Sequence, residues 1–380
     1  MRATSAIFGA ALALAPAWGL AEGVQFHLSG FGQYTVGKVL SGDDKVLTLP
    51  LGGTQTRQCP CAIANWEYVG VYEKNRGWQA DQESLIGVQG TMRMGDQFSA
   101  TAQVLARPNN KDMQPTLDWA YVSWNLNDHW TLQAGRKRIP LYYYSDFLYI
   151  GTAYPWVRPP QDVYGWPIYA YDGANAAYTG QWGSFTVDAN LWAGSFTHRN
   201  APYNTQIYWG DNTHEKWGNI FGGYITLTRG EWNGRVMVMR YKDSIWQDLP
   251  GGGRTNLLNP EPTTIMALSL NYDGANWLVR TELNRLKQKN IKGQYDYYLI
   301  GVGYKIGDWT PMATVSHYET KDLGFGIEAR DSHSLSLRYD LNKNWALKAQ
   351  YDISKDKTTP TFYDFFGKHK MLTFSAQATF

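Results

Sequence analysis

The sequence of 380 residues has little charge and few cysteines, and it lacks long apolar runs beyond its first residues. Charged residues make up 18% of the chain, below the roughly one quarter that is usual in soluble domains. The absence of an apolar run of about 18 residues past the N-terminal segment excludes a bundle of membrane-spanning helices. The formal net charge of +2 comes with no basic cluster, so no nucleic-acid partner is expected.

Aromatic residues and glycine are abundant instead. Aromatic residues make up 15% of the chain, with 17 Trp and 26 Tyr, and there are 38 Gly. A chain that is rich in both, yet has no apolar runs, suits a transmembrane β-barrel, because only every second residue of each strand meets lipid. The composition therefore predicts an all-β fold.

The first 21 residues form a targeting segment. Arg2 is its only charge, residues 6–14 are apolar, and Gly19 and Ala21 are small residues at the positions that a signal peptidase reads. We expect residues 1–21 to be a secretory signal peptide and residues 22–380 to be the barrel domain. The alternative is a buried N-terminal helix, against which the period-two alternation after residue 21 argues.

Two cysteines, Cys59 and Cys61, flank a single proline. Two cysteines alone make a poor metal site, and the chain has no Cys-x-x-Cys-His motif for covalent haem. We therefore expect no cofactor and no metal. An exported protein can hold a disulfide, so the pair is expected in an exposed loop, either bonded to each other or free.

Sixteen segments with period-two alternation are bounded by turn residues and predict sixteen antiparallel strands. Most are long enough for a tilted strand to cross the hydrocarbon, which takes about 9–11 residues. The segments are 24–37, 83–94, 97–107, 117–126, 130–139, 172–180, 184–195, 217–230, 234–244, 263–273, 276–290, 293–306, 310–320, 331–341, 345–356 and 370–380.

The connections between these segments alternate in length. Every second connection is very short, whereas the others are expected to be longer, the longest covering residues 38–82. A closed barrel with short periplasmic turns and long external loops requires this alternation, and a soluble β-sandwich does not. The short turns are 95–96, 127–129, 181–183, 231–233, 274–275, 307–309 and 342–344.

Aromatic residues mark the short turns. Rings with a polar edge prefer the membrane interface, so aromatic residues in or just after these turns predict a periplasmic girdle. Ordinary core tryptophans in turns are the alternative. The predicted girdle consists of Phe98, Trp130, Trp182, Trp232, Trp277, Trp309, Trp345 and Phe380.

The segment 370–380 alternates throughout, with Leu372, Phe374 and Phe380 on one face. An open edge strand at this point would be an aggregation hazard. We therefore expect the segment to pair with residues 24–37 and to close the barrel.

Residues 118–138 resemble the fourth and fifth strands of the Gram-negative general porins. The segment contains a short turn, Trp130, alternating apolar positions and the pair Gly135 and Arg136, in the order typical of that family. The terminal Phe380 and the number of strands are similar as well. The resemblance implies a homotrimer in the outer membrane, in contact with its lipids and lipopolysaccharide. It also implies passive diffusion through the barrel and recognition of Phe380 by the barrel assembly machinery.

The third long connection, residues 140–171, departs from an ordinary flexible loop because it combines many aromatic residues with five prolines. Such a loop needs a surface to pack on, and the resemblance implies that it folds into the lumen, which is too wide to be filled by wall side chains alone. A cap outside the barrel is the alternative. The predicted constriction residues are Tyr143, Asp146, Tyr154, Trp156, Arg158 and Asp162.

Strand parity assigns the charges that face the lumen, because an Arg or Lys facing lipid at the midplane costs about 2–4 kcal/mol. Arg138 shares the parity of the outward-facing Leu132, so it needs a bulge or the end of its strand to turn inward. The predicted wall residues are Arg93, Arg107, Arg138, Arg280, Glu282, Lys305, Arg338 and Lys348.

The charges of this wall predict its selectivity. We expect the loop residues Asp146, Arg158 and Asp162 to face Arg280, Arg338 and Lys348 across the lumen. The surplus of positive charge suggests a mild preference for anions. The alternative is that the charges pair with one another and only solvate the wall.

These features predict a non-enzymatic channel for passive diffusion of small hydrophilic solutes. A second interpretation is a substrate-selective channel, for example for a sugar or an organic anion, that uses the aromatic third loop. A third is an outer-membrane enzyme, but the chain has neither a Gly-x-Ser-x-Gly elbow nor a His-Glu-x-x-His motif, and its seven His lie on scattered segments.

Overall fold

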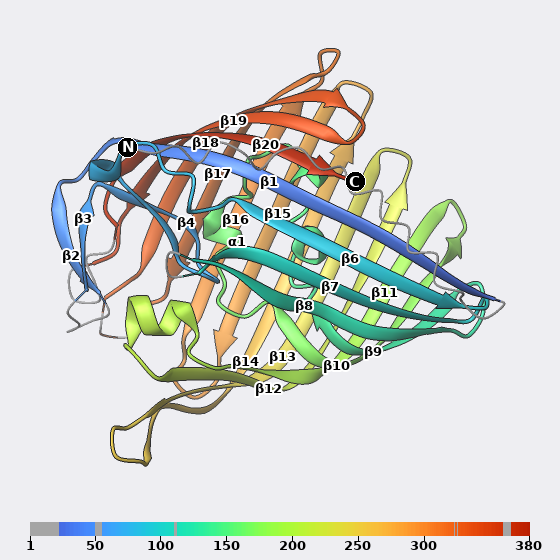
Figure 1. Cartoon of the computed structure of the whole chain (residues 1–380), viewed down its shortest axis with the longest axis horizontal. Coiled ribbons are helices and arrows are strands. Elements are labelled where there is room, and N and C mark those ends of the chain that lie inside the picture. The colour runs from blue at the N-terminus through green and yellow to red at the C-terminus, as the bar shows by residue number, and fades with distance from the viewer. Residues whose placement is uncertain (1–22, 50–54, 110–111, 323, 325, 360–365) are drawn as a thin grey trace, which may run out of the picture.

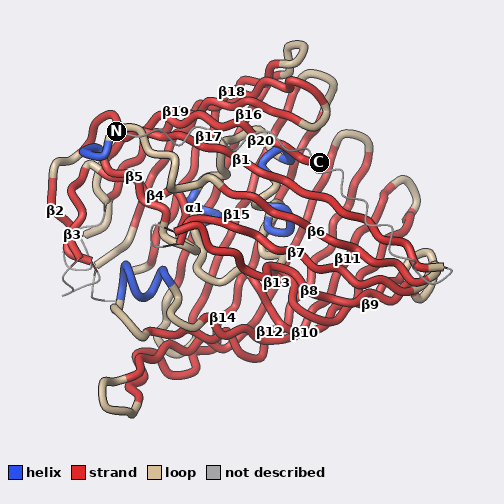
Figure 2. The backbone as a smooth tube through the Cα atoms, viewed as in Figure 1, coloured by secondary structure: helices blue, strands red, loops and turns tan. Residues whose placement is uncertain are grey.

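Sixteen antiparallel strands form a closed barrel (Figure 1), which confirms the predicted fold class. The computed structural model describes residues 23–49, 55–109, 112–322, 324, 326–359 and 366–380, so the expected export signal at 1–21 lies outside the described residues. Figure 2 shows that helix is confined to a few short segments. Within the described ranges, no helix is long and apolar enough to span a membrane.

Each of the sixteen predicted segments coincides with one barrel strand. The strands are β1 (Val24–Gly42), β6 (Leu85–Met94), β7 (Phe98–Asn109), β8 (Asp112–Asn125), β9 (Trp130–Arg138), β10 (Ala170–Trp182), β11 (Phe185–His198), β12 (Thr213–Arg229), β13 (Trp232–Asp248), β14 (Arg254–Asp273), β15 (Trp277–Gln288), β16 (Gln294–Tyr304), β17 (Trp309–Thr320), β18 (Ala329–Asn342), β19 (Trp345–Asp356) and β20 (His369–Thr379).

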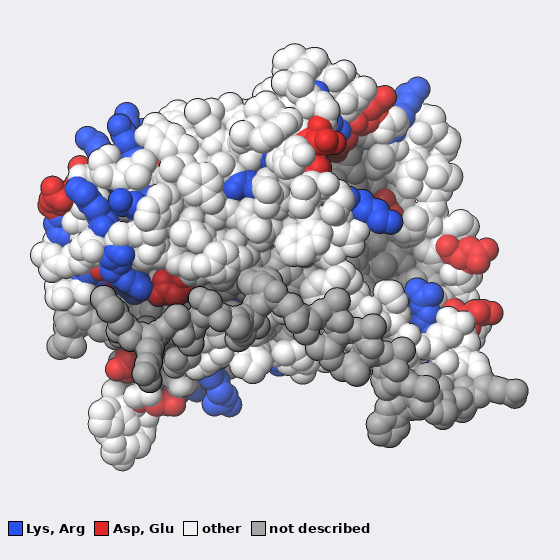
Figure 3. Space-filling view, turned by 45° about the horizontal axis from the view of Figure 1, so that its top comes forward, with Lys and Arg blue, Asp and Glu red and all other residues white. Residues whose placement is uncertain are grey.

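Alternating side chains give each strand an apolar outer face and a polar inner face. In β18, Leu335 and Leu337 are exposed on the outside, whereas Ser334 and Ser336 are buried inside. Figure 3 shows one outer face of the molecule, where charged side chains lie mostly toward the two ends and a broad, mostly uncharged area lies between them. This area is the surface that meets the hydrocarbon.

The barrel closes between its first and last strands, as predicted. β1 pairs with β20 in the register Phe31↔Thr379 to Lys38↔Leu372, and on its other side β1 pairs with β6. The backbone N–H of Gly30 donates to the carbonyl oxygen of Phe380 at 2.7 Å, which continues the ladder to the end of the chain. The closed ladder leaves neither terminal strand with an open edge.

The short turns are tight, and the opposite end is more varied than predicted. Gly183 and Gly230 occupy short turns with φ of 59° and 56°, a conformation that favours glycine. At the external end, only residues 110–111 separate β7 from β8, and residues 249–253 and 289–293 complete two further hairpins. The expectation of a longer connection is wrong at the first two of these points, because the strands continue past the membrane. At the third point the predicted segments 276–290 and 293–306 already left only two residues between them.

The first external loop forms two small antiparallel sheets. β2 (Lys45–Leu49) pairs with β3 (Gln55–Cys59), and β4 (Cys61–Asn65) pairs with β5 (Gly70–Glu73), which is followed by the short helix η1 (Lys74–Arg76). Val39 of β1, Tyr72 of β5 and Met371 of β20 are buried in one cluster. The loop therefore packs onto the inner side of the barrel where the first and last strands meet.

Candidate functional site

The third loop runs inside the barrel between β9 and β10. It contains the one-turn helices η2 (Ser145–Phe147), η3 (Gly151–Ala153) and α1 (Gln161–Tyr164). Trp156 is fully buried, and its Nε1 donates to Thr314 Oγ1 of β17 at 2.8 Å. The Tyr142 hydroxyl lies 2.9 Å from the Tyr297 hydroxyl of β16. The loop thus uses the inner wall as its packing surface, as predicted.

Aromatic side chains of this loop pack edge to face. The Tyr144 ring lies 5.7 Å from that of Trp156 and 5.8 Å from that of Tyr154, both nearly perpendicular. Such pairs contribute roughly 0.5–1.5 kcal/mol each beyond the burial of their area. Tyr154 and Trp156 therefore hold the loop in place, and their burial leaves little of either ring to meet a solute.

Arg158 is the charged anchor of the loop. Its Nη1 lies 2.7 Å from Glu83 Oε2 and its Nη2 lies 2.6 Å from Asp352 Oδ2. Burial raises the pKa of the Glu83 carboxyl, although Arg158 opposes that shift. The prediction that Arg158 faces the cations Arg338 and Lys348 across the lumen is wrong, because its partners are carboxylates that it touches directly.

Asp162 is also paired with a residue that the parity argument did not select. Its Oδ1 accepts from Arg330 Nε of β18 at 3.1 Å, and its Oδ2 accepts from Ser316 Oγ of β17 at 2.7 Å. All three side chains are buried. Asp162 therefore fixes α1 to the wall and does not contribute a free charge to the lumen.

Lys348 and Arg338 bind the backbone of the loop. Lys348 Nζ donates to the carbonyl oxygens of Gly151, Tyr154 and Trp156 at 2.5–2.7 Å. Arg338 Nη1 donates to the carbonyl oxygens of Thr152 and Tyr154 at 2.7 and 3.0 Å. Both residues face inward as predicted, but they contact the loop instead of lying across a water-filled gap from it.

Arg280 and Glu282 on β15 hold the start of the loop. Arg280 donates to the Tyr144 hydroxyl and lies 2.6 Å from Asp273 Oδ1. Glu282 accepts from the Tyr143 backbone N–H at 3.3 Å and from the Tyr164 hydroxyl. Both wall residues point inward as strand parity predicts, and both are committed to the loop.

Arg107 and Arg138 converge on Glu67 of the first loop. Arg107 Nη2 lies 2.9 Å from Glu67 Oε1, and Arg138 lies 3.7 Å from Glu67 and 3.2 Å from Asp118. Burial alone would raise the pKa of Glu67, but Arg107 and Arg138 together with the Tyr149 hydroxyl outweigh it and lower that pKa. Arg138 is the last residue of β9, and its side chain turns inward there. The end of the strand thus allows the inward position that the alternation within the strand would not.

The two remaining predicted wall residues lie near the periplasmic rim. Arg93 is exposed and has the inward parity of Gln89 and Thr91. Lys305 follows the end of β16, and its Nζ donates to the Gly274 carbonyl oxygen of the neighbouring turn at 3.2 Å. Its backbone N–H still donates to the Asn276 carbonyl oxygen at 2.7 Å, and Lys305 is half-buried with the parity of the buried Gly301 and Gly303, so it keeps the predicted inward parity one residue past the end of β16.

The predicted girdle residues are all exposed and lie at the short-turn ends of their strands. Trp182 is 75% exposed and Phe380 is 65% exposed. Several pair with a neighbouring ring, such as Trp309 with Tyr339 at 4.5 Å. Their action as an interfacial belt stays a prediction.

Besides Arg330, the sequence reasoning missed two cations of the lumen, Lys137 of β9 and Arg235 of β13. Both are half-buried and lie beside tyrosine rings of the wall, Lys137 over Tyr121 at 4.9 Å and Arg235 over Tyr224 at 4.1 Å. The signal that could have found Lys137 is its shared parity with Gln133, which donates inward to Ser123.

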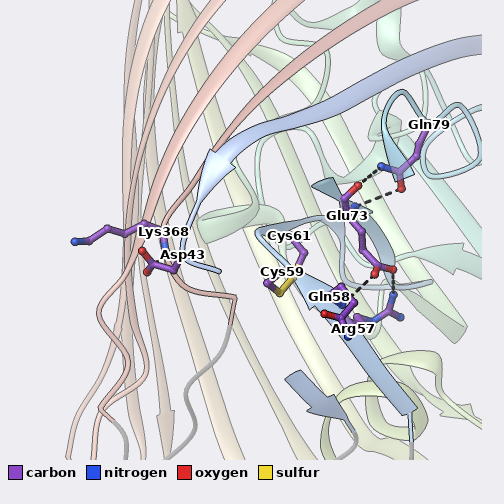
Figure 4. Close-up of a disulfide and its surroundings, with 8 residues drawn as sticks. All are labelled: Asp43, Arg57, Gln58, Cys59, Cys61, Glu73, Gln79 and Lys368. Atoms are coloured by element: carbon purple, nitrogen blue, oxygen red, sulfur yellow. Dashed lines mark hydrogen bonds and ion pairs between the residues drawn. A yellow bond between two sulfur atoms is a disulfide. The ribbon is translucent and has the colours of Figure 1, made fainter. Parts of the chain in front are cut away.

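The first loop carries the cysteine pair (Figure 4). Cys59 and Cys61 are joined in a disulfide across Pro60, between β3 and β4. Both are buried, so the prediction of an exposed position is wrong, because the loop folds onto the barrel. Beside them, Glu73 accepts from the Gln58 backbone N–H at 3.2 Å and contacts Arg57 at 3.5 Å. In the described ranges, no group of three His, Cys, Asp or Glu is placed to hold a metal ion.

Comparison with known proteins gives a family match and several similar barrels. Residues 3–359 match the family model described as Gram-negative porin. The outer membrane channel DcaP of Acinetobacter baumannii is similar with a TM-score of 0.59 at 11% identity, over 94% of this chain and 98% of that one. An anion-selective porin from Comamonas acidovorans has a TM-score of 0.56 at 14% identity, over 94% and 100%.

The trimer form of in-vitro folded OmpT from Vibrio cholerae is also similar. Its TM-score is 0.52 at 12% identity, over 94% of this chain and 100% of that one. At such identities the likeness concerns the fold alone. No curated protein sequence matches this chain.

Proposed function

The chain belongs to the Gram-negative porin family and is an outer-membrane channel, and from this premise we propose that it lets small hydrophilic solutes diffuse passively, with a mild preference for anions. The observation that carries the proposal is the anchoring of the third loop. Arg158, Lys348 and Arg338 fix it to the wall through buried ion pairs and carbonyl contacts. A loop fixed in this way narrows the lumen permanently. A passive diffusion channel needs such a fixed constriction, whereas a gated channel needs a loop that moves.

The preference for anions rests on which charges stay free. The loop carboxylate Asp162 is paired with Arg330, and the wall carboxylate Asp352 is paired with Arg158. Lys137 and Arg235 have no carboxylate within ion-pair distance among the described residues. The carboxylates Asp146 and Asp188 likewise have no cation at that distance in the described part of the chain, so only a mild preference is proposed. Free cations in the lumen attract anions, and their effect reaches about 8 Å at physiological salt.

The proposal extends to processing and assembly. Residues 1–21 serve as the export signal, and Phe380 is the contact for the barrel assembly machinery. The barrel assembles as a homotrimer in lipids and lipopolysaccharide, which the trimer form of the similar Vibrio cholerae protein supports. No chemical step is needed for diffusion, so the protein acts without catalysis.

Planar bilayers test this function. We expect stepwise insertion of the purified protein, a linear current–voltage relation, and a reversal potential in a KCl gradient that indicates chloride passing more readily than potassium. Liposome swelling with neutral sugars of increasing size should slow smoothly with size. A conductance that saturates with one solute, or a reversal potential on the cation side, would contradict the proposal.

A further inference from the structure

A group of cations lies on the outer surface of the barrel, at the external ends of β12 to β15. These strands are neighbours in the wall, and the cations share the exposed parity of their strands. The chain as a whole has 35 basic and 33 acidic residues, so a group of cations on one face is a local concentration of charge. The group, called the outer basic patch, consists of the exposed residues Lys216, Arg240, Lys242, Lys287 and Lys289.

Strand register places four of these cations at the corners of a rectangle. Arg240 of β13 and Lys287 of β15 pair with the same residue of β14, which lies between them. Lys242 likewise pairs with a residue of β14 whose carbonyl oxygen accepts from the Lys289 backbone N–H at 2.9 Å. Positions two strands apart are separated by roughly 10 Å, and alternate residues of one strand by roughly 7 Å. Two pairs of cations therefore face each other across β14, and Lys216 extends the first pair onto β12.

The protein does not neutralise the outer basic patch. Within the described ranges, none of its five side chains forms an ion pair or a hydrogen bond with another residue. The outward-facing carboxylate of the next strand, Asp296 of β16, is paired with Arg285 at 2.5 Å. Like charges at such short spacings repel one another. The patch therefore favours an anion that comes from outside the protein.

The patch lies at the external edge of the apolar band. Lys242 follows Trp232 by ten residues, and Lys287 follows Trp277 by ten residues, both tryptophans being at short-turn ends of strands. A tilted strand rises roughly 2.5 Å per residue along the membrane normal, so ten residues rise about 25 Å. The apolar band of an outer-membrane barrel has about this height. An outward-facing cation is tolerated at this level, unlike at the midplane.

Apolar side chains cover the wall below the patch. Val236 of β13, Leu268 of β14 and Leu283 of β15 are about half exposed and lie in one row across the three strands. A lipid whose acyl chains lie on this row brings its headgroup to the level of the cations. The surface thus offers an apolar part and a cationic part at the heights that a lipid of the outer leaflet requires.

We propose that the outer basic patch binds the two phosphates of the lipid A part of lipopolysaccharide, one at Arg240 and Lys242 and the other at Lys287 and Lys289. The proposal deepens the proposed function, because it rests on the placement of the barrel in lipopolysaccharide and names the contact. Phosphates form charge-assisted hydrogen bonds with guanidinium and ammonium groups. Two cation pairs on either side of β14 suit a glycolipid with a phosphate at each end of a disaccharide, whereas phosphatidylglycerol has only one phosphate.

Diphosphoryl and monophosphoryl lipid A are the matched probes, because they differ by one phosphate. Their binding to the purified barrel is measured by native mass spectrometry in a neutral detergent, with a chelator that removes divalent cations. We expect wild type to bind diphosphoryl lipid A about tenfold to thirtyfold more tightly, since each Lys or Arg near an anionic headgroup contributes roughly fivefold. Lys287→Gln combined with Lys289→Gln should lower the affinity for diphosphoryl lipid A by the same factor and bring the ratio close to one.

The control is Arg229→Gln combined with Lys343→Gln, which removes two exposed cations at the short-turn end of the barrel. It should leave both affinities unchanged, and heat-resistant migration on gels shows that each variant is folded. Equal binding of the two lipid A forms by wild type would overturn the proposal. An unchanged ratio in the Lys287 and Lys289 variant, or equally tight binding of phosphatidylglycerol, would overturn it as well.

The same preparation separates this proposal from the proposed function. If wild type forms open channels in planar bilayers but does not distinguish the two lipid A forms, the lipid site fails and the proposed function stands. If the folded protein forms no channel, the proposed function fails whichever lipid it binds.

Discussion

The ammonium group of Lys348 on β19 donates a hydrogen bond of 2.7 Å to the carbonyl oxygen of Trp156 in the third loop. The same ammonium also binds the carbonyl oxygens of Gly151 and Tyr154. Three backbone groups that are buried inside a barrel need such a partner, because an unsatisfied polar group costs roughly 1–3 kcal/mol. One wall residue thus fixes the whole middle of the loop.

The first prediction concerns this contact. Lys348→Met keeps the apolar stem and removes the donor, so the free energy of unfolding should fall by about 1–3 kcal/mol. We also expect larger current fluctuations of the open channel in bilayers, because the loop loses its anchor. Lys343→Met, at an exposed turn, is the control and should change neither quantity. A quiet, wild-type current in Lys348→Met would show that Lys348 does not hold the loop.

The second prediction concerns the ion pairs of Arg158 with Glu83 and Asp352. Arg158→Gln leaves the buried Glu83 and the partly buried Asp352 without their cation, which costs about 3–5 kcal/mol of stability. Burial already raises the pKa of Glu83, and removal of Arg158 should raise that pKa further. A carboxyl whose pKa is higher in the folded state loses its contribution to stability as the pH rises, so the variant should become less stable with rising pH. Denaturant unfolding in detergent at pH 5 and pH 8 measures both effects. A variant as stable as wild type at both pH values would contradict the assignment.

The third prediction concerns barrel closure at Phe380. The ring lies so close to Gly30 that a Cβ at this position would overlap it, and the two backbones exchange hydrogen bonds at 2.7 and 2.9 Å. Phe380→Ala and Gly30→Val should each reduce the amount of folded protein in the outer membrane severalfold. The assembled fraction of Phe380→Ala should keep nearly wild-type stability. Gly234→Ala, where a Cβ has room, serves as the control, and normal membrane levels of Phe380→Ala would refute the prediction.

The fourth prediction concerns Glu328, which lies just before β18 in an external loop. Burial raises its pKa to about 7 although Arg330 opposes the shift, and its Oε2 lies 3.4 Å from the Tyr208 hydroxyl of η4 (Asn204–Tyr208). A carboxyl whose pKa is higher in the folded state than in the unfolded state binds its proton more tightly when folded. Its contribution to stability is therefore complete below about pH 4.5 and is lost as the pH rises toward 7.

Unfolding at pH 5 and pH 8 tests this sign. Wild type should be less stable at pH 8, by an amount on the order of 1–3 kcal/mol from this group. Glu328→Gln should remove that part of the difference, whereas Glu319→Gln, at an exposed position, should not. An unchanged pH dependence in Glu328→Gln would place the titrating group elsewhere.

The strands could be predicted from the sequence because their signal is local. The side-chain direction of each barrel strand repeats every two residues. The alternation alone therefore shows that Leu335 faces outward and Ser336 inward, without knowledge of the neighbouring strands. The turn at Gly230 and the aromatic residue after it are equally local. Closure through residues 370–380 could also be predicted, because an open edge there would leave backbone N–H and C=O groups unpaired.

The partners of the charged residues could not be predicted in the same way. Parity places Lys348 inside the barrel, but it does not give the path of the third loop, which decides what Lys348 touches. Arg158 lies in that loop, where no two-residue period applies. Arg235 was missed because the alternation in segment 234–244 does not settle which face is inward: the charged Arg240 shares the exposed face of Val236 and Val238. Such contacts depend on tertiary packing between residues far apart in the chain.

The measurement that tests the account most directly is the conductance of a channel without the middle of its third loop. In this variant a short Gly-Ser linker replaces residues 146–162, and heat-resistant migration together with a β-rich circular dichroism spectrum shows that the barrel has folded. The loop narrows the lumen in this account, so the single-channel conductance should rise severalfold above that of wild type. A folded variant whose conductance equals that of wild type would contradict the account, because the passage would then be set elsewhere.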